Sequence, residues 1–127
     1  MWEAYGLENE DLLWASATLH GGIGGYRKAV CGLLSSSAVC LGLRHRRPLG
    51  DGEEAVEKAR DTANDKAKTM AEEFQKKFGS IICEELADFG DPDAGPPDPE
   101  IMEKMMEAAC LPQALFCVEK LYELDEG

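Results

Sequence analysis

A four-residue repeat of alanine that continues into larger apolar residues most constrains how this chain can fold. Its members are Ala55, Ala59, Ala63, Ala67, Met70, Phe74 and Phe78. Side chains at this spacing lie on one face of a helix. Pairs of Glu and Lys four residues apart, such as Glu54 and Lys58, support a helix in the same segment. The spacing therefore predicts a long helix over residues 51–78, ended by Gly79.

The segments before this helix also favour helical structure. We expect a short helix over residues 8–20, with Asn9 as its N-cap, ended by a glycine-rich turn at residues 21–25. Residues 26–43 are apolar on nearly every side, which is typical of a helix buried in the middle of a bundle. A basic run and Pro48 then end that helix.

The segments after the long helix complete an all-α pattern. Ser80 is a candidate cap for a short helix that contains Cys83. Residues 90–99 hold four prolines and two glycines and predict a loop, and Asp98 with Pro99 predicts the start of a final helix. Pro112 should break or restart that helix near residues 110–111. We therefore expect a single helical domain over residues 1–127, an all-α bundle of about five or six helices with a buried central helix.

Charge and hydropathy exclude several function classes. The net charge of −12 argues against nucleic-acid binding. No apolar run reaches the ~18 residues that a membrane span needs, and the N-terminus shows no signal peptide. We expect a cytoplasmic protein that does not bind membranes. Thiols are usually kept reduced in the cytoplasm, so its cysteines predict metal binding or catalysis before a disulfide framework.

The chain has five cysteines, Cys31, Cys40, Cys83, Cys110 and Cys117, and none lies in a CxxC or CxxCH pair. Covalent haem is therefore not expected. Cys31 and Cys40 are nine residues apart, which places them on opposite sides of a helix. The set that can converge from separate helices is Cys31, Cys83 and one of Cys110 or Cys117. The alternative is that these cysteines pack as small apolar side chains, which is the preferred interpretation for Cys40.

The order of these motifs resembles a prokaryotic family of redox-active proteins named for its motif C…GCAxxG…C…C. The glycine turn Gly21-Gly22-Ile23-Gly24 matches that of the family, and Cys31 matches the motif's second cysteine. Cys83 within residues 78–86 matches the third cysteine, and Cys110, with Val118 and Leu121 downstream, matches the fourth. The family's domain is also similar to one found in split-Soret cytochromes.

Two positions depart from the family pattern. The GCAxxG block reads Val30-Cys31-Gly32-Leu33-Leu34-Ser35, so only its cysteine is kept. The family's first cysteine would fall upstream of Met1, on a first helix that residues 1–127 do not include. Two alternatives are open: the chain begins inside the domain, or this member has lost that ligand. Cys117 or His20 would then have to supply a fourth ligand.

The resemblance implies a redox function with two chemical versions. Cys31, Cys83 and Cys110 would either cycle as thiol and disulfide in electron transfer or, with Cys117, bind an iron–sulfur cluster or another soft metal. Gly22 and Gly24 of the glycine turn are candidate cofactor-binding residues, because such a turn before a helix can hold an anion. A nucleotide site is not expected, since no GxGxxG follows a strand. A redox partner protein and a homodimer are the expected partners.

The alternative function is an interaction module. In that interpretation the chain dimerises through the alanine face of the helix at residues 51–78, and its cysteines are structural. Visible absorbance separates the two hypotheses, because an iron–sulfur cluster is coloured and an interaction module is not.

Overall fold

The computed structural model describes residues 5–87 and 98–126, and this part of the chain is all-α, which confirms the expected fold class. It contains five α-helices and one short 3₁₀ helix, η1, and no strand. Their bounds are α1 Asp11–Trp14, α2 Gly32–His45, η1 Leu49–Asp51, α3 Glu53–Phe78, α4 Cys83–Leu86 and α5 Pro99–Glu126.

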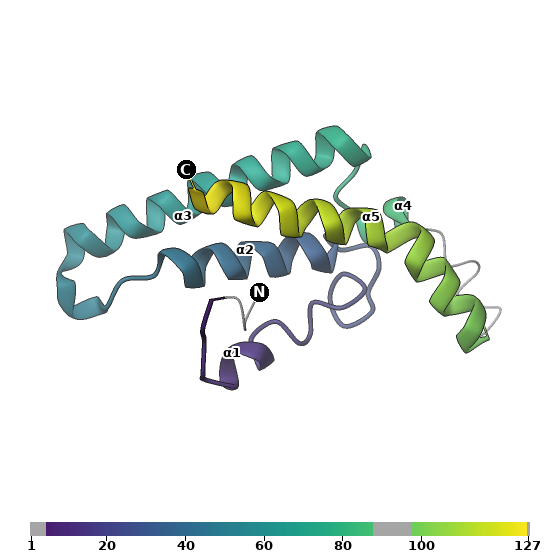
Figure 1. Cartoon of the computed structure of the whole chain (residues 1–127), viewed down its shortest axis with the longest axis horizontal. Coiled ribbons are helices and arrows are strands. Elements are labelled where there is room, and N and C mark those ends of the chain that lie inside the picture. Colours follow the sequence, from purple (N-terminus) through teal and green to yellow (C-terminus); the bar gives the residue numbers. More distant parts are fainter. Residues whose placement is uncertain (1–4, 88–97, 127) are drawn as a thin grey trace.

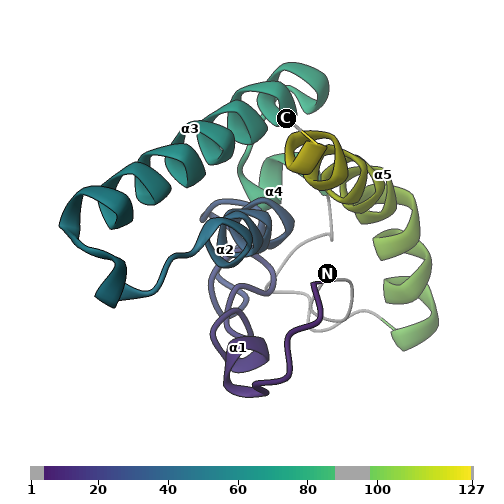
Figure 2. The ribbon, with the colours of Figure 1, turned by 60° about the vertical axis from the view of Figure 1, so that its left-hand side comes forward.

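Three long helices make up most of the molecule. Helices α2 and α3 form an antiparallel hairpin through η1, and α5 returns antiparallel to α3 (Figure 1). Seen from another side, α2 lies between α1 and the pair formed by α3 and α5 (Figure 2). Each of the three long helices contacts the other two.

The hydrophobic core lies where these three helices meet. Phe74 is 0% exposed, and Met70 and Leu41 are each 1% exposed. Phe74 packs against Phe78 and Phe116 in a cluster of rings whose centroids lie 4.8 to 5.9 Å apart. Ala67, the last alanine of the repeat, and the neighbouring Ala71 are half-buried against the same core. Small side chains at this point let helices approach closely.

The boundaries of α3 and α5 follow from local sequence signals. Gly79 ends α3 with φ +81°, a conformation that favours glycine, and its N–H donates to the carbonyl of Gln75 at 2.8 Å. Asp98 precedes α5, and its Oδ1 accepts a hydrogen bond from the Glu100 N–H at 2.9 Å. The predicted end of α3 at Gly79 and the predicted start of α5 at Asp98 and Pro99 are both confirmed. Helix α3 starts two residues later than expected. Of the predicted loop at residues 90–99, all but 98 and 99 lie outside the described residues.

Three boundary predictions are wrong. The helix expected over residues 8–20 is only the single turn α1, followed by irregular turns. The helix expected from residue 26 begins at Gly32, because residues 26–31 form a turn and an isolated antiparallel bridge that pairs Val30 with Ile82. Helix α5 continues through Pro112 without a break, although it bends along its course (Figure 1). Pro112 is exposed, and a bend relieves the clash between its ring and the carbonyl four residues earlier in the same helix.

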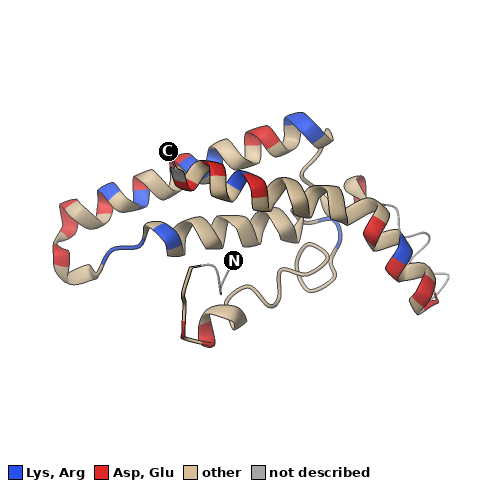
Figure 3. Ribbon diagram, viewed as in Figure 1, with Lys and Arg blue, Asp and Glu red and all other residues tan. Residues whose placement is uncertain are grey.

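Acidic residues are concentrated on α3 and α5, whereas most of α2 carries no charge (Figure 3). The basic end of α2 is joined to the end of α5 by the Arg44–Asp125 ion pair. Within the described ranges, none of the helices combines the length and the apolar character that crossing a bilayer requires.

Candidate cysteine centre

The isolated bridge between Val30 and Ile82 brings two cysteines together. The Cys31 N–H donates to the Ile81 carbonyl at 2.6 Å, and the Cys83 N–H donates to the Ala29 carbonyl at 3.0 Å. Because side chains alternate along extended backbone, Cys31 and Cys83 lie on the same side of the bridge. They are diagonal neighbours across it, a relation with a typical separation of about 7–8 Å.

Each of these cysteines also lies where a helix begins. Cys31 is the N-cap of α2, and Cys83 is the first residue of α4. Both are buried, each with 9% of its surface exposed. Burial raises the pKa of Cys31, the amides of Leu33 and Leu34 lower it, and the neighbouring Cys83 raises it further. The Cys31 thiol makes no capping hydrogen bond, and the Leu34 N–H already donates to the Cys31 carbonyl at 3.0 Å.

Helix α5 carries a third cysteine, Cys110, within electrostatic range of this pair. Cys110 is half-buried, and burial is the main reason that its pKa is raised. The charges of Cys31 and Cys83 raise it further, whereas the guanidinium of Arg27 lowers it. Arg27 is held beside this centre by a 2.7 Å hydrogen bond from its Nη2 to the Ala87 carbonyl. Cys31, Cys83 and Cys110 thus form one electrostatically coupled group, which we call the cysteine centre.

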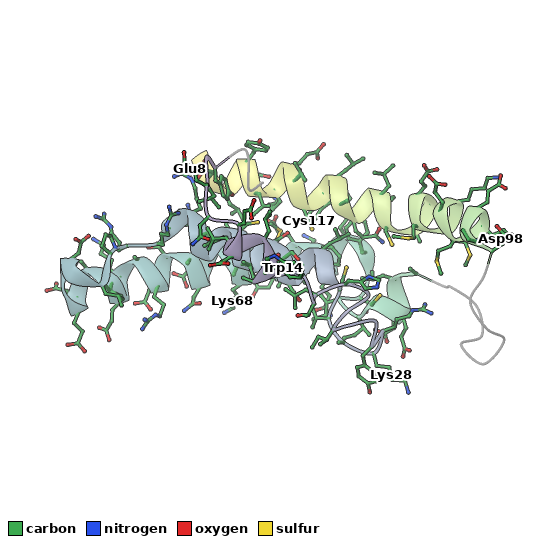
Figure 4. All side chains as sticks on the ribbon, turned by 90° about the horizontal axis from the view of Figure 1, so that it is seen from below. Glu8, Trp14, Lys28, Lys68, Asp98 and Cys117 are labelled. Carbon is green, nitrogen blue, oxygen red and sulfur yellow. The ribbon has the colours of Figure 1, made fainter. Side chains whose placement is uncertain are left out.

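The other two cysteines have different surroundings. Cys117, on α5 (Figure 4), is 3% exposed. It belongs to the same hydrophobic core cluster as Cys31. Burial raises its pKa, a hydrogen bond with Ser37 lowers it, and Cys31 raises it. Cys40 packs against the edge of the core and lines an apolar pocket instead of the cysteine centre. The separation of Cys40 from Cys31 was predicted from helical phase, but Cys31 precedes the helix as its N-cap, so the phase argument does not apply to it.

A metal site needs several ligand side chains close to one point. All five cysteines are free, and within residues 5–87 and 98–126 no three or more His, Cys, Asp or Glu side chains are placed to hold a metal ion. Their sulfur donors suit a soft metal, but the side chains do not fit one as they stand. His20, the other candidate ligand, is exposed.

The glycine turn is occupied by its own internal hydrogen bonds. The Gly24 N–H donates to the Thr18 carbonyl at 2.6 Å, so it is not available to an anion. Gly22 is buried with φ +91°, and a Cβ there would lie 2.6 Å from the Tyr26 carbonyl. Gly22 therefore has a role in packing the turn, whereas a Cβ on the exposed Gly24 would meet nothing within 4 Å. Cofactor binding by these two glycines stays a prediction.

The sequence did not predict the roles of two residues beside the cysteine centre, Gln113 and Gly32. Gln113 lies on the same face of α5 as Cys110 and Cys117, is 7% exposed, and its Oε1 has no hydrogen-bond partner among the described residues. Its spacing from these cysteines is the signal that would have found it. Gly32 contacts the Leu19 carbonyl so closely that a Cβ would lie 1.7 Å from its oxygen, and no sequence pattern marks this contact.

One comparison with known proteins identifies a family. The model of the family described as "Putative redox-active protein (C_GCAxxG_C_C)" matches residues 1–124, which confirms the resemblance found in the glycine turn and the order of the cysteines. No curated protein and no solved structure matches the chain.

Proposed function

The chain belongs to the C_GCAxxG_C_C family of redox-active proteins, and on this premise we propose that its cysteine centre carries out thiol–disulfide electron transfer. Two observations support the proposal: one backbone bridge joins the segments that carry Cys31 and Cys83, and Cys110 on α5 lies within electrostatic range of both. Free buried cysteines commonly act as apolar filler, but filler does not require three coupled thiols beside an arginine.

Accessibility and charge assign a role to each thiol. Cys110 is the entry thiol, because it is the only half-buried member of the centre. Burial raises its pKa overall, and Arg27 offsets a small part of that rise. Cys31 is the resolving thiol, because it is buried more deeply than Cys110; burial raises its pKa, and the amides of Leu33 and Leu34 lower it in part. Cys83 lies beside Cys31 as the third thiol and can take over the resolving step when Cys31 is absent.

The electron balance needs a disulfide from a partner, either a protein or a small molecule. The Cys110 thiolate attacks one partner sulfur, forming a mixed disulfide and releasing the first partner thiolate. The Cys31 thiolate then attacks the Cys110 sulfur, closing an internal disulfide and releasing the second partner thiolate. Two electrons and two protons leave the protein, and the partner disulfide is reduced to two thiols. The reverse sequence reduces the protein again.

The test uses reduced protein and oxidised glutathione. Peptide mapping under non-reducing conditions should show an internal disulfide from Cys110 to Cys31, with three of the five thiols still free. Cys110→Ser should abolish this product, whereas Cys31→Ser should accumulate glutathione on Cys110 or shift the bond to Cys83. Cys40→Ser is the matched control and should behave as the unchanged protein.

Two outcomes would overturn the proposal. One is oxidation that occurs only between chains or only at Cys40. The other is anaerobically purified protein that carries a thiolate-bound metal or iron–sulfur cluster, seen by metal analysis and visible absorbance, and loses it in Cys31→Ser. The second result would assign the same cysteines to a metal centre instead.

A further inference from the structure

A pocket separate from the cysteine centre lies between the N-terminal segment, α2 and α5. Its volume is about 330 Å³, near the lower end of the ~300–1,000 Å³ typical of small-molecule sites. Leu7, Leu12, Leu33 and Val39 provide much of its wall. The remaining lining residues include hydroxyls and thiols, and no described charged side chain lines it. An anionic ligand such as a nucleotide would therefore find no counter-charge on the pocket wall, and Arg44, which lies within electrostatic range of Tyr5, is already paired with Asp125.

One buried donor in this pocket lacks an acceptor. Tyr5 lines the pocket, and its hydroxyl oxygen is buried with no hydrogen-bond partner within the ranges that the structure describes. A buried hydroxyl without a partner is costly, and most are satisfied by protein, water or a ligand. Burial also raises the pKa of Tyr5, so the hydroxyl keeps its proton and remains a donor at neutral pH. The pocket therefore favours a ligand that carries an acceptor.

Two thiols further define the ligand. Cys40 and Cys117 line the pocket from α2 and α5, and sulfur makes favourable contacts with aromatic rings. The pocket thus has apolar walls, two sulfur atoms, one phenol donor and no charged lining residue. A neutral ring that bears a carbonyl fits these surroundings. Cys117 also belongs to the core cluster that contains Cys31, so the pocket adjoins the region of the cysteine centre.

We propose that this pocket binds a small neutral aromatic carbonyl compound of the quinone type, with one carbonyl oxygen accepting a hydrogen bond from Tyr5. This binding site goes beyond the proposed thiol chemistry and does not depend on it. A second copy of the chain is the competing occupant, since Leu13 and Val118 line the same pocket and are exposed.

The test measures equilibrium dialysis of the full chain against duroquinone (tetramethyl-1,4-benzoquinone), whose fully substituted ring resists addition of thiols. Durene, the same ring without carbonyls, is the matched probe. We expect saturable binding of duroquinone, weakened about 2- to 10-fold in Tyr5→Phe, the range that corresponds to loss of one hydrogen bond. Binding of durene should be the same in both proteins, because Phe keeps the ring that packs against the probe.

A second pair of variants tests the location. Ala114 lines the pocket, so Ala114→Leu should fill it and abolish binding of both probes. Ala108 is exposed on the same helix and does not line the pocket, so Ala108→Leu should bind as the unchanged protein does. Circular dichroism and the reaction with oxidised glutathione check that each variant folds, independently of the pocket.

Three results would overturn the inference. They are an absence of saturable duroquinone binding, equal binding by Tyr5→Phe and the unchanged protein, and equal effects of the two leucine variants. Sedimentation equilibrium measures whether a second copy of the chain occupies the pocket instead. A dimer that Ala114→Leu dissociates would show that the pocket is an interface between copies, and the quinone assignment would fail.

Discussion

Replacing Gly32 by Ala should destabilise the protein, even though alanine is the better helix former and follows the cysteine in the family motif. A Cβ at this position would lie 1.7 Å from the Leu19 carbonyl oxygen and 2.9 Å from the carbonyl carbon. Both atoms are backbone, so no side chain can rotate away. Reaching 3.0 Å from the oxygen, below which real Cβ contacts are essentially absent, requires the two segments to separate by at least 1.3 Å.

The cost follows from what that movement disturbs. Overpacking of this kind typically costs about 1–3 kcal/mol. Gly32 directly follows Cys31, whose N–H bond to Ile81 is already short at 2.6 Å, and a broken backbone bond adds about 1 kcal/mol. Alanine returns at most about 1 kcal/mol of helix propensity. We therefore expect a net loss of about 2 kcal/mol from a total stability of about 5–15 kcal/mol.

Gly42 provides the matched control within the same helix. It is exposed, and a Cβ there would meet nothing within 4 Å. Gly42→Ala should therefore stabilise the protein by about 0.5–1 kcal/mol. Urea unfolding of both variants under reducing conditions, followed by circular dichroism, measures the opposite signs. Faster reaction of Cys31 with a thiol reagent in Gly32→Ala would report the displaced bridge. Equal stability of the two variants would refute the clash.

Two further predictions concern protonation and the buried amide. Burial raises the pKa of the thiols of Cys31, Cys40, Cys110 and Cys117, so the fold favours their protonated forms. This stabilisation is complete below the ordinary thiol pKa of about 8.5 and is lost as the pH rises through the raised pKa values. The urea concentration at the unfolding midpoint should therefore fall above pH ~8.5, and it should fall less steeply in Cys40→Ser. A midpoint that stays constant with pH would contradict this prediction. Gln113→Leu removes a buried oxygen that has no hydrogen-bond partner among the described residues. The free energy of unfolding measured in urea should therefore stay unchanged or rise by about 1 kcal/mol. A loss above about 2 kcal/mol would mean that the amide makes a hydrogen bond in the folded protein.

The sequence predicted the elements whose signals are local. Helix α3 follows from its own apolar stripe and its terminal Gly79, and the start of α5 follows from Asp98 and Pro99. The start of α2 was missed because residues 26–31 pair with a segment beyond α3, and helical periodicity contains no information about that partner. The effect of Pro112 was overestimated because a proline can bend a helix instead of breaking it, and the packing of α5 on both sides of Pro112 is not visible in the local sequence.

The membership of the candidate site stays a prediction from the sequence, and its local geometry comes from the structure. Family order selected Cys31, Cys83 and Cys110, and the structure adds the bridge that places two of them side by side. The Gly32 contact and the buried amide of Gln113 depend on tertiary packing, so they became visible only in the structure. The departure from the family motif at Gly32 also gains a physical reason, since this fold leaves no room for the usual alanine.

The bridge between Val30 and Ile82 has a consequence for how the chain folds. It closes a loop that contains α2, η1 and α3, but the hairpin of α2 and α3 already brings the two ends of that loop together. Closing it therefore costs little additional chain entropy once the hairpin exists. Cys110 lies further along the chain and has to wait for α5. During synthesis from the N-terminus, Cys31 and Cys83 should meet first, and the third thiol should join an already assembled pair.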